Sequence, residues 1–441
     1  MTTADAAPSP AEPALHQVLL SRGYLRLLLL CTLLGIPVAL ACFLFVGLQH
    51  TLQEAVWETL PRRLGYEHAP WWWPLPALLT AGLALAPIVT RTPGRGGHLP
   101  VRGLGGSPIG PKAVPGVVLA TLTALPLGVV LGPEAPLMAV GSGLALLVAR
   151  HLPRGTDKRS TAVLATTGST AAISTILGGP LVAAVLVVES AALAGPRLVV
   201  LLLPCLLASA GGALVFTGFG QWTGLETGAL SLPAVPPGAR PDAGDFLWGV
   251  PVAVLVALLV VLGRRLGHLT AHWTARHTAP RTVACGLAVG GALSGYALLT
   301  GRDPAEAALS GQATLAELAA DPHAWSVAAL AALVLCKGLA WGVCLGAFRG
   351  GPVFPALLLG AAVGVACSGL PGLGPAPALA AGLAASGAAV LGLPLSGAVL
   401  AALLLGQDAY DQMPLIVVAA VVAVLVTQWP RRREARTGGA P

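Results

Sequence analysis

Long apolar runs follow one another along the chain and are separated by short polar or Gly/Pro-rich segments. The runs are continuous and do not alternate between apolar and polar residues, so they predict helices and not the strands of an outer-membrane barrel. A helix needs about 20 residues to cross a bilayer. Several runs are shorter, which predicts helices that are interrupted inside the membrane and line a cavity there. The runs lie at residues 27–47, 75–90, 114–131, 137–149, 161–177, 181–195, 197–216, 247–263, 282–300, 325–346, 353–367, 376–391, 395–406 and 414–428.

The composition places the chain in a lipid bilayer. Of its 441 residues 55% are hydrophobic and 10% are charged, whereas soluble domains carry about 25% charged residues. We therefore expect an all-α, multi-pass protein of the cell (plasma) membrane. The net charge of +7 sits in short loops, so we expect no nucleic-acid partner. The seven cysteines lie in apolar stretches without metal-ligand spacing, and we expect no metal and no cofactor.

The charges between the runs predict the topology. Segments 91–112, 150–159, 264–281 and 431–436 hold 16 basic residues and two acids, while 48–73, 217–246 and 301–324 hold four basic residues and ten acids. Basic loops lie on the cytoplasmic side of membrane proteins. Because 91–112 and 150–159 are then both inside, the runs between them must cross and return at the joint 132–136.

Two pairs of segments show an internal duplication. Residues 177–186 and 391–400 are identical at seven of ten positions, and residues 132–136 and 351–355 both read G-P-x-x-P. The linker between the halves falls on the outer side, so the repeats are predicted to be inverted, as in many transporters. Broken helices in such halves direct their N-termini at a shared midplane site, which suits an anion. We expect a tail (1–24), a first repeat (25–231), a linker (232–246), a second repeat (247–430) and a basic tail (431–441).

Four stretches, in this order and spacing, resemble the CLC family of chloride channels and chloride/proton exchangers: residues 95–100, 132–136, 177–190 and 351–355. The resemblance covers about residues 25–430, without the cytoplasmic regulatory domains of many members. It implies a CLC-like inverted repeat of broken and re-entrant helices, assembled as a homodimer with one pore per subunit. It also implies passage of chloride or similar small anions past a gate at Glu134.

The same resemblance implies an anion-binding set. Backbone N–H groups of Gly97, Leu99, Val353 and Phe354 are expected to converge on the anion, and Gly97 lacks the hydroxyl that the family carries at its position. The family's late tyrosine falls on Tyr410, or on Ala409 if the alignment is anchored at the following proline.

The motifs leave the question of proton coupling open. The inner glutamate of the family's exchangers falls on Ser190, and the preceding Glu189 is the candidate for a proton path. Charged residues at membrane depth are costly and are functional candidates. Glu134 is the strongest of them because it lies in a broken segment, whereas Arg197, Arg349 and Lys337 also have interfacial, helix-end or ion-pairing interpretations. The other candidates are Glu189, Asp408 and Asp411.

Several functions fit these features. The first is chloride transport through a pore gated by Glu134, passive or weakly coupled to protons, and the alternative is an obligate chloride/proton exchanger. A secondary transporter of a small organic substrate would need side-chain ligands, and few polar candidates lie near the G-P-x-x-P segments. An intramembrane hydrolase using Ser142 would need a base within hydrogen-bond reach, and none is placed there, so we expect no enzymatic activity.

Overall fold

The computed structural model describes residues 15–104, 108–151, 158–177, 179–191, 195–223, 232 and 240–436. These residues form helices joined by short turns and contain no β-strand, only an isolated bridge between Gly132 and Gly351. The all-α prediction is confirmed. The first fourteen residues, residues 233–239 of the predicted linker and the last five residues lie outside this description, so the predicted tails and linker are seen only in part.

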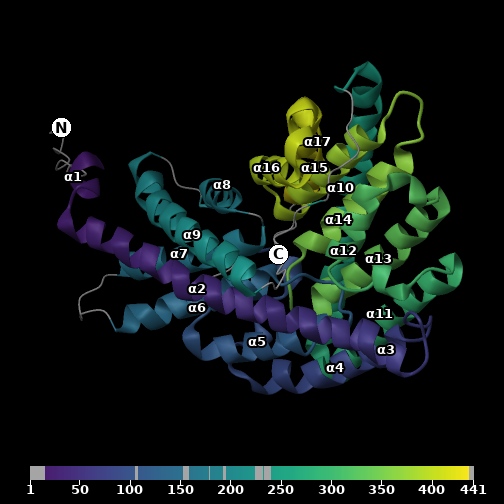
Figure 1. Cartoon of the computed structure of the whole chain (residues 1–441), viewed down its shortest axis with the longest axis horizontal. Coiled ribbons are helices and arrows are strands. Elements are labelled where there is room, and N and C mark those ends of the chain that lie inside the picture. Colours follow the sequence, from purple (N-terminus) through teal and green to yellow (C-terminus); the bar gives the residue numbers. More distant parts are fainter. Residues whose placement is uncertain are drawn as a thin grey trace, which may run out of the picture.

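The first half runs from α1 to α9, and Figure 1 shows these helices in purple to teal. A short π-helical turn, Ala55–Thr59, joins α2 to α3, and short 3-10 turns lie between α4 and α6. The helices are α1 (Leu15–Leu19), α2 (Arg22–Glu54), α3 (Leu60–Arg63), α4 (Pro74–Arg91), α5 (Val114–Leu122), α6 (Glu134–Arg150), α7 (Lys158–Ile176), α8 (Pro180–Ser190) and α9 (Pro196–Thr223).

The second half runs from α10 to α17 and is drawn in green to yellow (Figure 1). It contains one helix, α12, in the acidic segment 301–324 that the hydropathy pattern left as a loop. The helices are α10 (Ala243–Arg276), α11 (Thr278–Thr300), α12 (Gln312–Ala320), α13 (Val327–Ala347), α14 (Val353–Cys367), α15 (Pro375–Leu391), α16 (Pro394–Leu405) and α17 (Ala409–Arg436).

Seven helical stretches among the described residues are long and apolar enough to cross a membrane, so this is a multi-pass membrane protein. Four apolar helical segments are shorter, among them α8 and α14, as the short hydrophobic runs predicted. Two predicted loops are partly wrong: residues 48–63 are helical, from the end of α2 through the π-helical turn to α3, and residues 264–276 belong to α10. A 34-residue helix is about 50 Å long at 1.5 Å per residue. It is therefore longer than the hydrocarbon core of a bilayer, which is about 30 Å thick, and Arg264, Arg265 and Arg276 lie in its C-terminal half.

Helices of the two halves pack directly on each other. The α4 helix lies along α11, and glycine allows this approach because a Cβ at Gly286 would meet the carbonyl oxygen of Leu78. The α2 helix packs on α7 and α9, and α10 packs on α13, α15 and α17.

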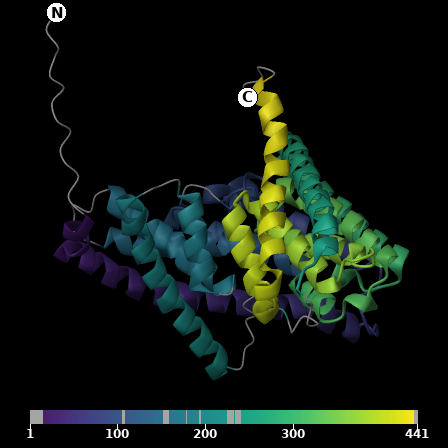
Figure 2. The same ribbon diagram turned by 90° about the horizontal axis from the view of Figure 1, so that it is seen from above.

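Figure 2 shows α9 and α17, the last helices of the two halves, projecting from the body in opposite directions. This is the arrangement expected of inverted repeats.

Candidate anion site

The two G-P-x-x-P segments meet inside the protein. The N–H of Gly132 donates to the carbonyl oxygen of Gly351 at 2.8 Å, and the N–H of Gly351 donates back at 2.5 Å. Pro133 and Pro352 then precede the first residues of α6 and α14. Proline suits a helix start because the first helical N–H groups have no intrahelical acceptor. The repeat therefore brings two helix N-termini to one point.

Glu134 occupies this junction. Its side chain is fully buried, and its Oε1 accepts a hydrogen bond from the backbone N–H of Phe354 at 2.9 Å. Its Oε2 has no hydrogen-bond partner among the described residues. The N-terminus of a helix attracts negative charge, so the carboxylate of one half lies where the helix of the other half would hold an anion.

Glycines leave the room for this carboxylate. A Cβ built on Gly351 would overlap Oε2 of Glu134, and a Cβ built on Gly132 would overlap the same carboxylate. The G-P-x-x-P motif thus does two things here: proline begins each helix, and glycine lets the acidic group lie between the two backbones.

The segment at residues 95–100 departs from the expected geometry. Residues 94–97 all have positive φ angles, and only a three-residue 3-10 turn, Pro100–Arg102, follows. A single turn carries little helix dipole. The N–H of Gly97 donates to the carbonyl oxygen of Gly94 at 2.8 Å, so it is not free for an anion. In this conformation the Gly97 N–H therefore has a backbone acceptor, and its role as an anion donor stays a prediction.

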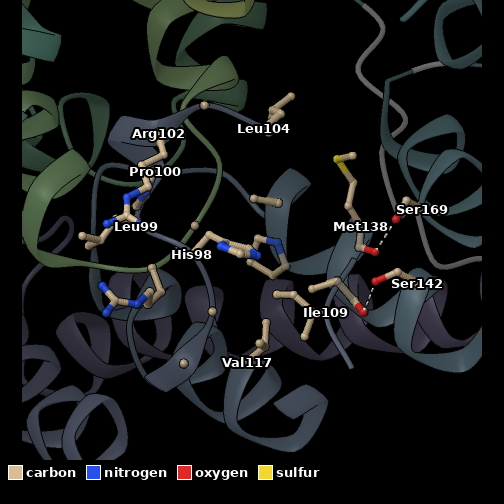
Figure 3. A pocket seen from close by; sticks show the side chains of 18 of the residues that line it. His98, Leu99, Pro100, Arg102, Leu104, Ile109, Val117, Met138, Ser142 and Ser169 are labelled. Atoms are coloured by element: carbon tan, nitrogen blue, oxygen red, sulfur yellow. Dashed lines mark hydrogen bonds between the residues drawn. The ribbon is translucent and has the colours of Figure 1, made fainter. Parts of the chain in front are cut away.

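A cavity of about 270 Å³ lies between this segment and the start of α6. Gly97 and Leu99 line it, and Figure 3 shows His98, Arg102 and Met138 around it. The Ser142 hydroxyl donates to the carbonyl oxygen of Ala139 within α6, and the Ser169 hydroxyl of α7 donates to that of Met138 in α6. The described lining of this cavity includes no acid.

Arg349 is the cation that the sequence interpretation undervalued. Its side chain lines the cavity and is only 9% exposed, and it lies two residues before the second G-P-x-x-P segment. Its Nε donates to the carbonyl oxygen of Arg95 at 3.2 Å, and one terminal nitrogen donates to that of Phe348 at 3.1 Å. The sequence signal for Arg349 was its position two residues before the motif, but the residue was interpreted as lying at a helix end.

Glu189 lies in the last turn of α8 and contacts the helix that matches α8 in the second half. Its carboxylate accepts hydrogen bonds from the N–H groups of Leu395 and Ser396, at 2.8 and 2.6 Å, and from the Ser396 hydroxyl at 2.7 Å. These donors belong to the first turn of α16. Glu189 therefore caps α16, and the structure records no contact between it and Glu134.

Tyr410 is not brought to the site. It is the second residue of α17 and is 88% exposed, while its neighbour Ala409 is buried. Nearby, Asp411 pairs with Arg240 at 3.1 Å on the surface. The Tyr410 side chain is therefore exposed in this conformation, and its contact with an anion stays a prediction.

Lys337 has a structural role. Its fully buried Nζ donates to three carbonyl oxygens, those of Ala307, Ala308 and Leu309, at 2.9, 2.8 and 3.3 Å. The interpretation as an ion-pair partner is wrong for this lysine, because its acceptors are backbone carbonyls. These bonds hold segment 301–311, the outer segment of the predicted topology, against α13.

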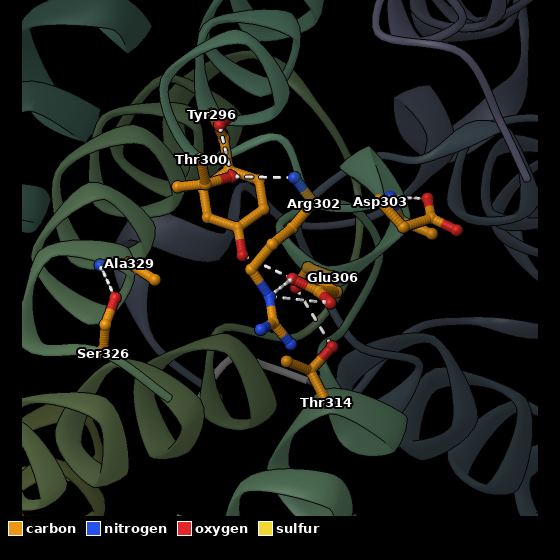
Figure 4. Close-up of polar contacts among 9 residues, drawn as sticks. Tyr296, Thr300, Arg302, Asp303, Glu306, Thr314, Ser326 and Ala329 are labelled. Atoms are coloured by element: carbon orange, nitrogen blue, oxygen red, sulfur yellow. Dashed lines mark hydrogen bonds and ion pairs between the residues drawn. The ribbon is translucent and has the colours of Figure 1, made fainter. Parts of the chain in front are cut away.

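A polar cluster fixes the same outer segment from the other side (Figure 4). The Nε of Arg302 lies 2.8 Å from a carboxylate oxygen of Glu306, and the hydroxyl of Tyr296 donates to that carboxylate. The Arg302 guanidinium lies 3.9 Å from the ring centre of Trp325, within cation–π distance. The outer segment is therefore anchored to both α11 and the start of α13.

Comparison with known proteins identifies the family. The model described as "Voltage gated chloride channel" matches residues 100–428. The chain belongs to this family, and the resemblance seen in the sequence is confirmed.

Individual relatives are more distant. The chain is 33% identical over 199 residues to a protein of Escherichia coli O1:K1 named "Putative ion-transport protein YfeO", and 32% identical over 168 residues to the protein of that name in Escherichia fergusonii. These alignments cover 44% and 38% of this chain, and less than half of the relatives' length, 46% and 39%.

Solved structures support the fold over almost the whole chain. A slow cyanobacterial Cl⁻/H⁺ antiporter matches with a TM-score of 0.75 at 17% identity, covering 94% of this chain and 96% of its own. A CLC-type fluoride/proton antiporter matches with a TM-score of 0.70 at 17% identity, covering 92% and 95%. At this identity the likeness establishes the fold alone.

Proposed function

We propose that this protein carries chloride or similar small anions across the membrane through a path gated by Glu134, passively or with weak coupling to protons. The observation that carries the proposal is the hydrogen bond from the Phe354 N–H to the buried Glu134 carboxylate. Backbone N–H groups at a helix N-terminus bind an anion without a fixed full charge, so the ion can leave again.

The gate follows from competition for this position. An ionised carboxylate and a chloride ion cannot share one donor group, because two like charges in a low-dielectric site repel each other strongly. One hydrogen bond holds Glu134, and its second oxygen is unpartnered among the described residues. Protonation removes the charge, weakens that bond and frees the N–H of Phe354 for an anion.

An obligate anion/proton exchanger is the second candidate, since two of the structurally similar proteins are proton antiporters. Such a mechanism needs a second proton carrier on the inner side, and Glu189 is the candidate. Its three hydrogen bonds to α16 give it a structural role already. This favours passive or weakly coupled transport.

A secondary transporter of an organic substrate has less support. The cavity of about 270 Å³ is below the range of roughly 300–1,000 Å³ that ligand pockets have. The hydroxyl groups of Ser142 and Ser169 in this cavity already donate to helix carbonyl oxygens, so neither has a proton left for an organic substrate.

Chloride flux from proteoliposomes, recorded together with internal pH, tests the proposal. We expect fast chloride efflux with little or no uphill proton movement. Stoichiometric proton movement against its gradient would establish the exchanger, and absence of flux for every small anion would refute anion transport.

We further propose, from the family resemblance, that the protein is a homodimer. Mass measurement in detergent or nanodiscs tests this.

A further inference from the structure

The cavity beside Glu134 is positively charged without a counterion among its described residues. Arg102 and Arg349 line it, and its described lining includes no carboxylate. Arg349 forms no ion pair with a described acid. A buried charge is costly unless it is paired. Two backbone carbonyls stabilise the guanidinium in part, and an anion in the cavity would complete its coordination.

The guanidinium of Arg349 has enough N–H donors to bind such an anion as well. A guanidinium has five N–H donors and always carries its charge. Two of them bind the carbonyl oxygens of Arg95 and Phe348. The remaining donors include the second terminal nitrogen, which forms no hydrogen bond with a described residue.

Arg349 also lies where the backbone offers few donors to an anion. The segment 94–102 offers a single 3-10 turn and a Gly97 N–H that is already bound to Gly94. On this side of Glu134 the backbone therefore supplies little positive potential. The guanidinium lies at this same segment, hydrogen-bonded to Arg95, and replaces the partial charge of a helix end by a full charge.

We propose that Arg349 directly binds a small monovalent anion in this cavity, next to the gate, and thereby sets the anion affinity of the path. The proposal rests on the proposed function for its role in transport, but the binding site itself can be measured without transport. A full buried charge holds an anion more tightly than N–H dipoles do, so it favours high affinity at the expense of release.

The residue also has a positioning role, since it ties Arg95 to the second half of the chain. The two roles predict different outcomes. Loss of a ligand raises the anion concentration at half-maximal flux while flux at saturation persists. Loss of positioning lowers the maximal flux and leaves the half-saturating concentration unchanged.

The experiment uses the full-length protein. Chloride and bromide binding is measured by calorimetry in detergent, and the concentration dependence of chloride flux is measured in proteoliposomes, for wild type, Arg349→Gln and Arg349→Lys. Arg63→Gln is the matched control, because Arg63 is an exposed arginine outside the described lining of this cavity and is screened by salt.

We expect the Gln variant to weaken binding and to raise the half-saturating concentration about tenfold or more, the usual size of a lost charge-assisted hydrogen bond. The Lys variant should keep most of the affinity, and Arg63→Gln should change it less than about threefold. Unchanged binding in a folded Gln variant would overturn the proposal.

Crystallography gives a readout that does not depend on a variant. In bromide-soaked wild type we expect an anomalous peak within about 3.5 Å of the Arg349 guanidinium, slightly beyond oxygen-acceptor distances. No peak there at saturating bromide would overturn the proposal even if the variants fail to fold. A wild type that binds bromide at Arg349 but passes no anion would refute the proposed function and leave this site standing.

Discussion

The backbone N–H of Phe354 donates to Oε1 of Glu134 at 2.9 Å, joining two residues that are 220 positions apart in the chain. Each belongs to one copy of the G-P-x-x-P motif, but only the first copy carries an acid; Val353 holds the equivalent place in the second. The bend is therefore built without a carboxylate in one half, and the acid at Glu134 is available for function.

Glu134→Gln tests the role of its charge. The amide resembles the protonated carboxyl group, so the competition with the anion is lost. Wild-type flux should rise as pH falls, because protonation releases the gate. The Gln variant should conduct at a high level throughout, lose most of its dependence on external pH, and lose any proton coupling. Flux measured across external pH in proteoliposomes checks this.

Poor folding of the Gln variant would indicate a structural role for Glu134. If Glu134 were the ion-pair partner of a buried cation, its replacement would leave that cation unpaired, at a cost of about 3–5 kcal/mol. A well-folded Gln variant that stays as pH-sensitive as wild type would contradict the gate, and protonation would then have to be sought at Glu189 or Asp408.

Gly351→Ala should displace the Glu134 carboxylate without removing its charge. The new methyl group would overlap the Glu134 carboxylate, whose flexible end must move away from Phe354. We expect anion flux with weakened pH dependence, close to that of Glu134→Gln. Gly291→Ala is the matched control, since a Cβ there meets nothing within 4 Å. Wild-type pH dependence in both alanine variants would argue against the observed position of the carboxylate.

Sequence patterns predicted much of this architecture. The short apolar runs and the two G-P-x-x-P copies predicted broken helices meeting from inverted halves, because helix length and proline chemistry are local properties. The ends of α2 and α10 were mispredicted, since helices continue beyond the bilayer where hydropathy no longer marks them.

The site could be predicted only in part. Glu134 stood out because an acid in a broken apolar segment is costly. The occupied N–H of Gly97, the surface position of Tyr410 and the partners of Lys337 depend on backbone angles and on contacts between distant segments. Spacing in one sequence does not reveal those contacts. Arg349 lies near the motif in the sequence, but its burial at the cavity is seen only in the folded structure.

Lys337→Met should destabilise the protein without changing anion affinity. The substitution removes the donor to three carbonyl oxygens of residues 307–309. A buried polar group left without a partner costs about 1–3 kcal/mol. We expect a lower Tm in detergent and faster proteolysis of the outer segment 301–311. An unchanged Tm and cleavage rate would show that these bonds do not hold the segment.

Glu189→Gln separates capping from proton transfer. The amide oxygen still accepts from the first turn of α16, but the charge that favours a helix N-terminus is lost, at about 0.3–1 kcal/mol. We expect a small fall in Tm and chloride flux within about twofold of wild type. Glu189→Ala, which removes the acceptor altogether, should lower the Tm further. Proton movement that is present in wild type and lost only in the Gln variant would instead assign Glu189 to a proton path.

In the proposed gate, the Glu134 carboxylate takes the place of an anion at the N-terminus of α14. Glu134→Ala empties that place, so anomalous diffraction from a bromide-soaked crystal of the variant is the decisive measurement. We predict an anomalous peak within about 3.5 Å of the Phe354 backbone nitrogen, weaker or absent in wild type. A folded variant at saturating bromide with no peak there would contradict the gate.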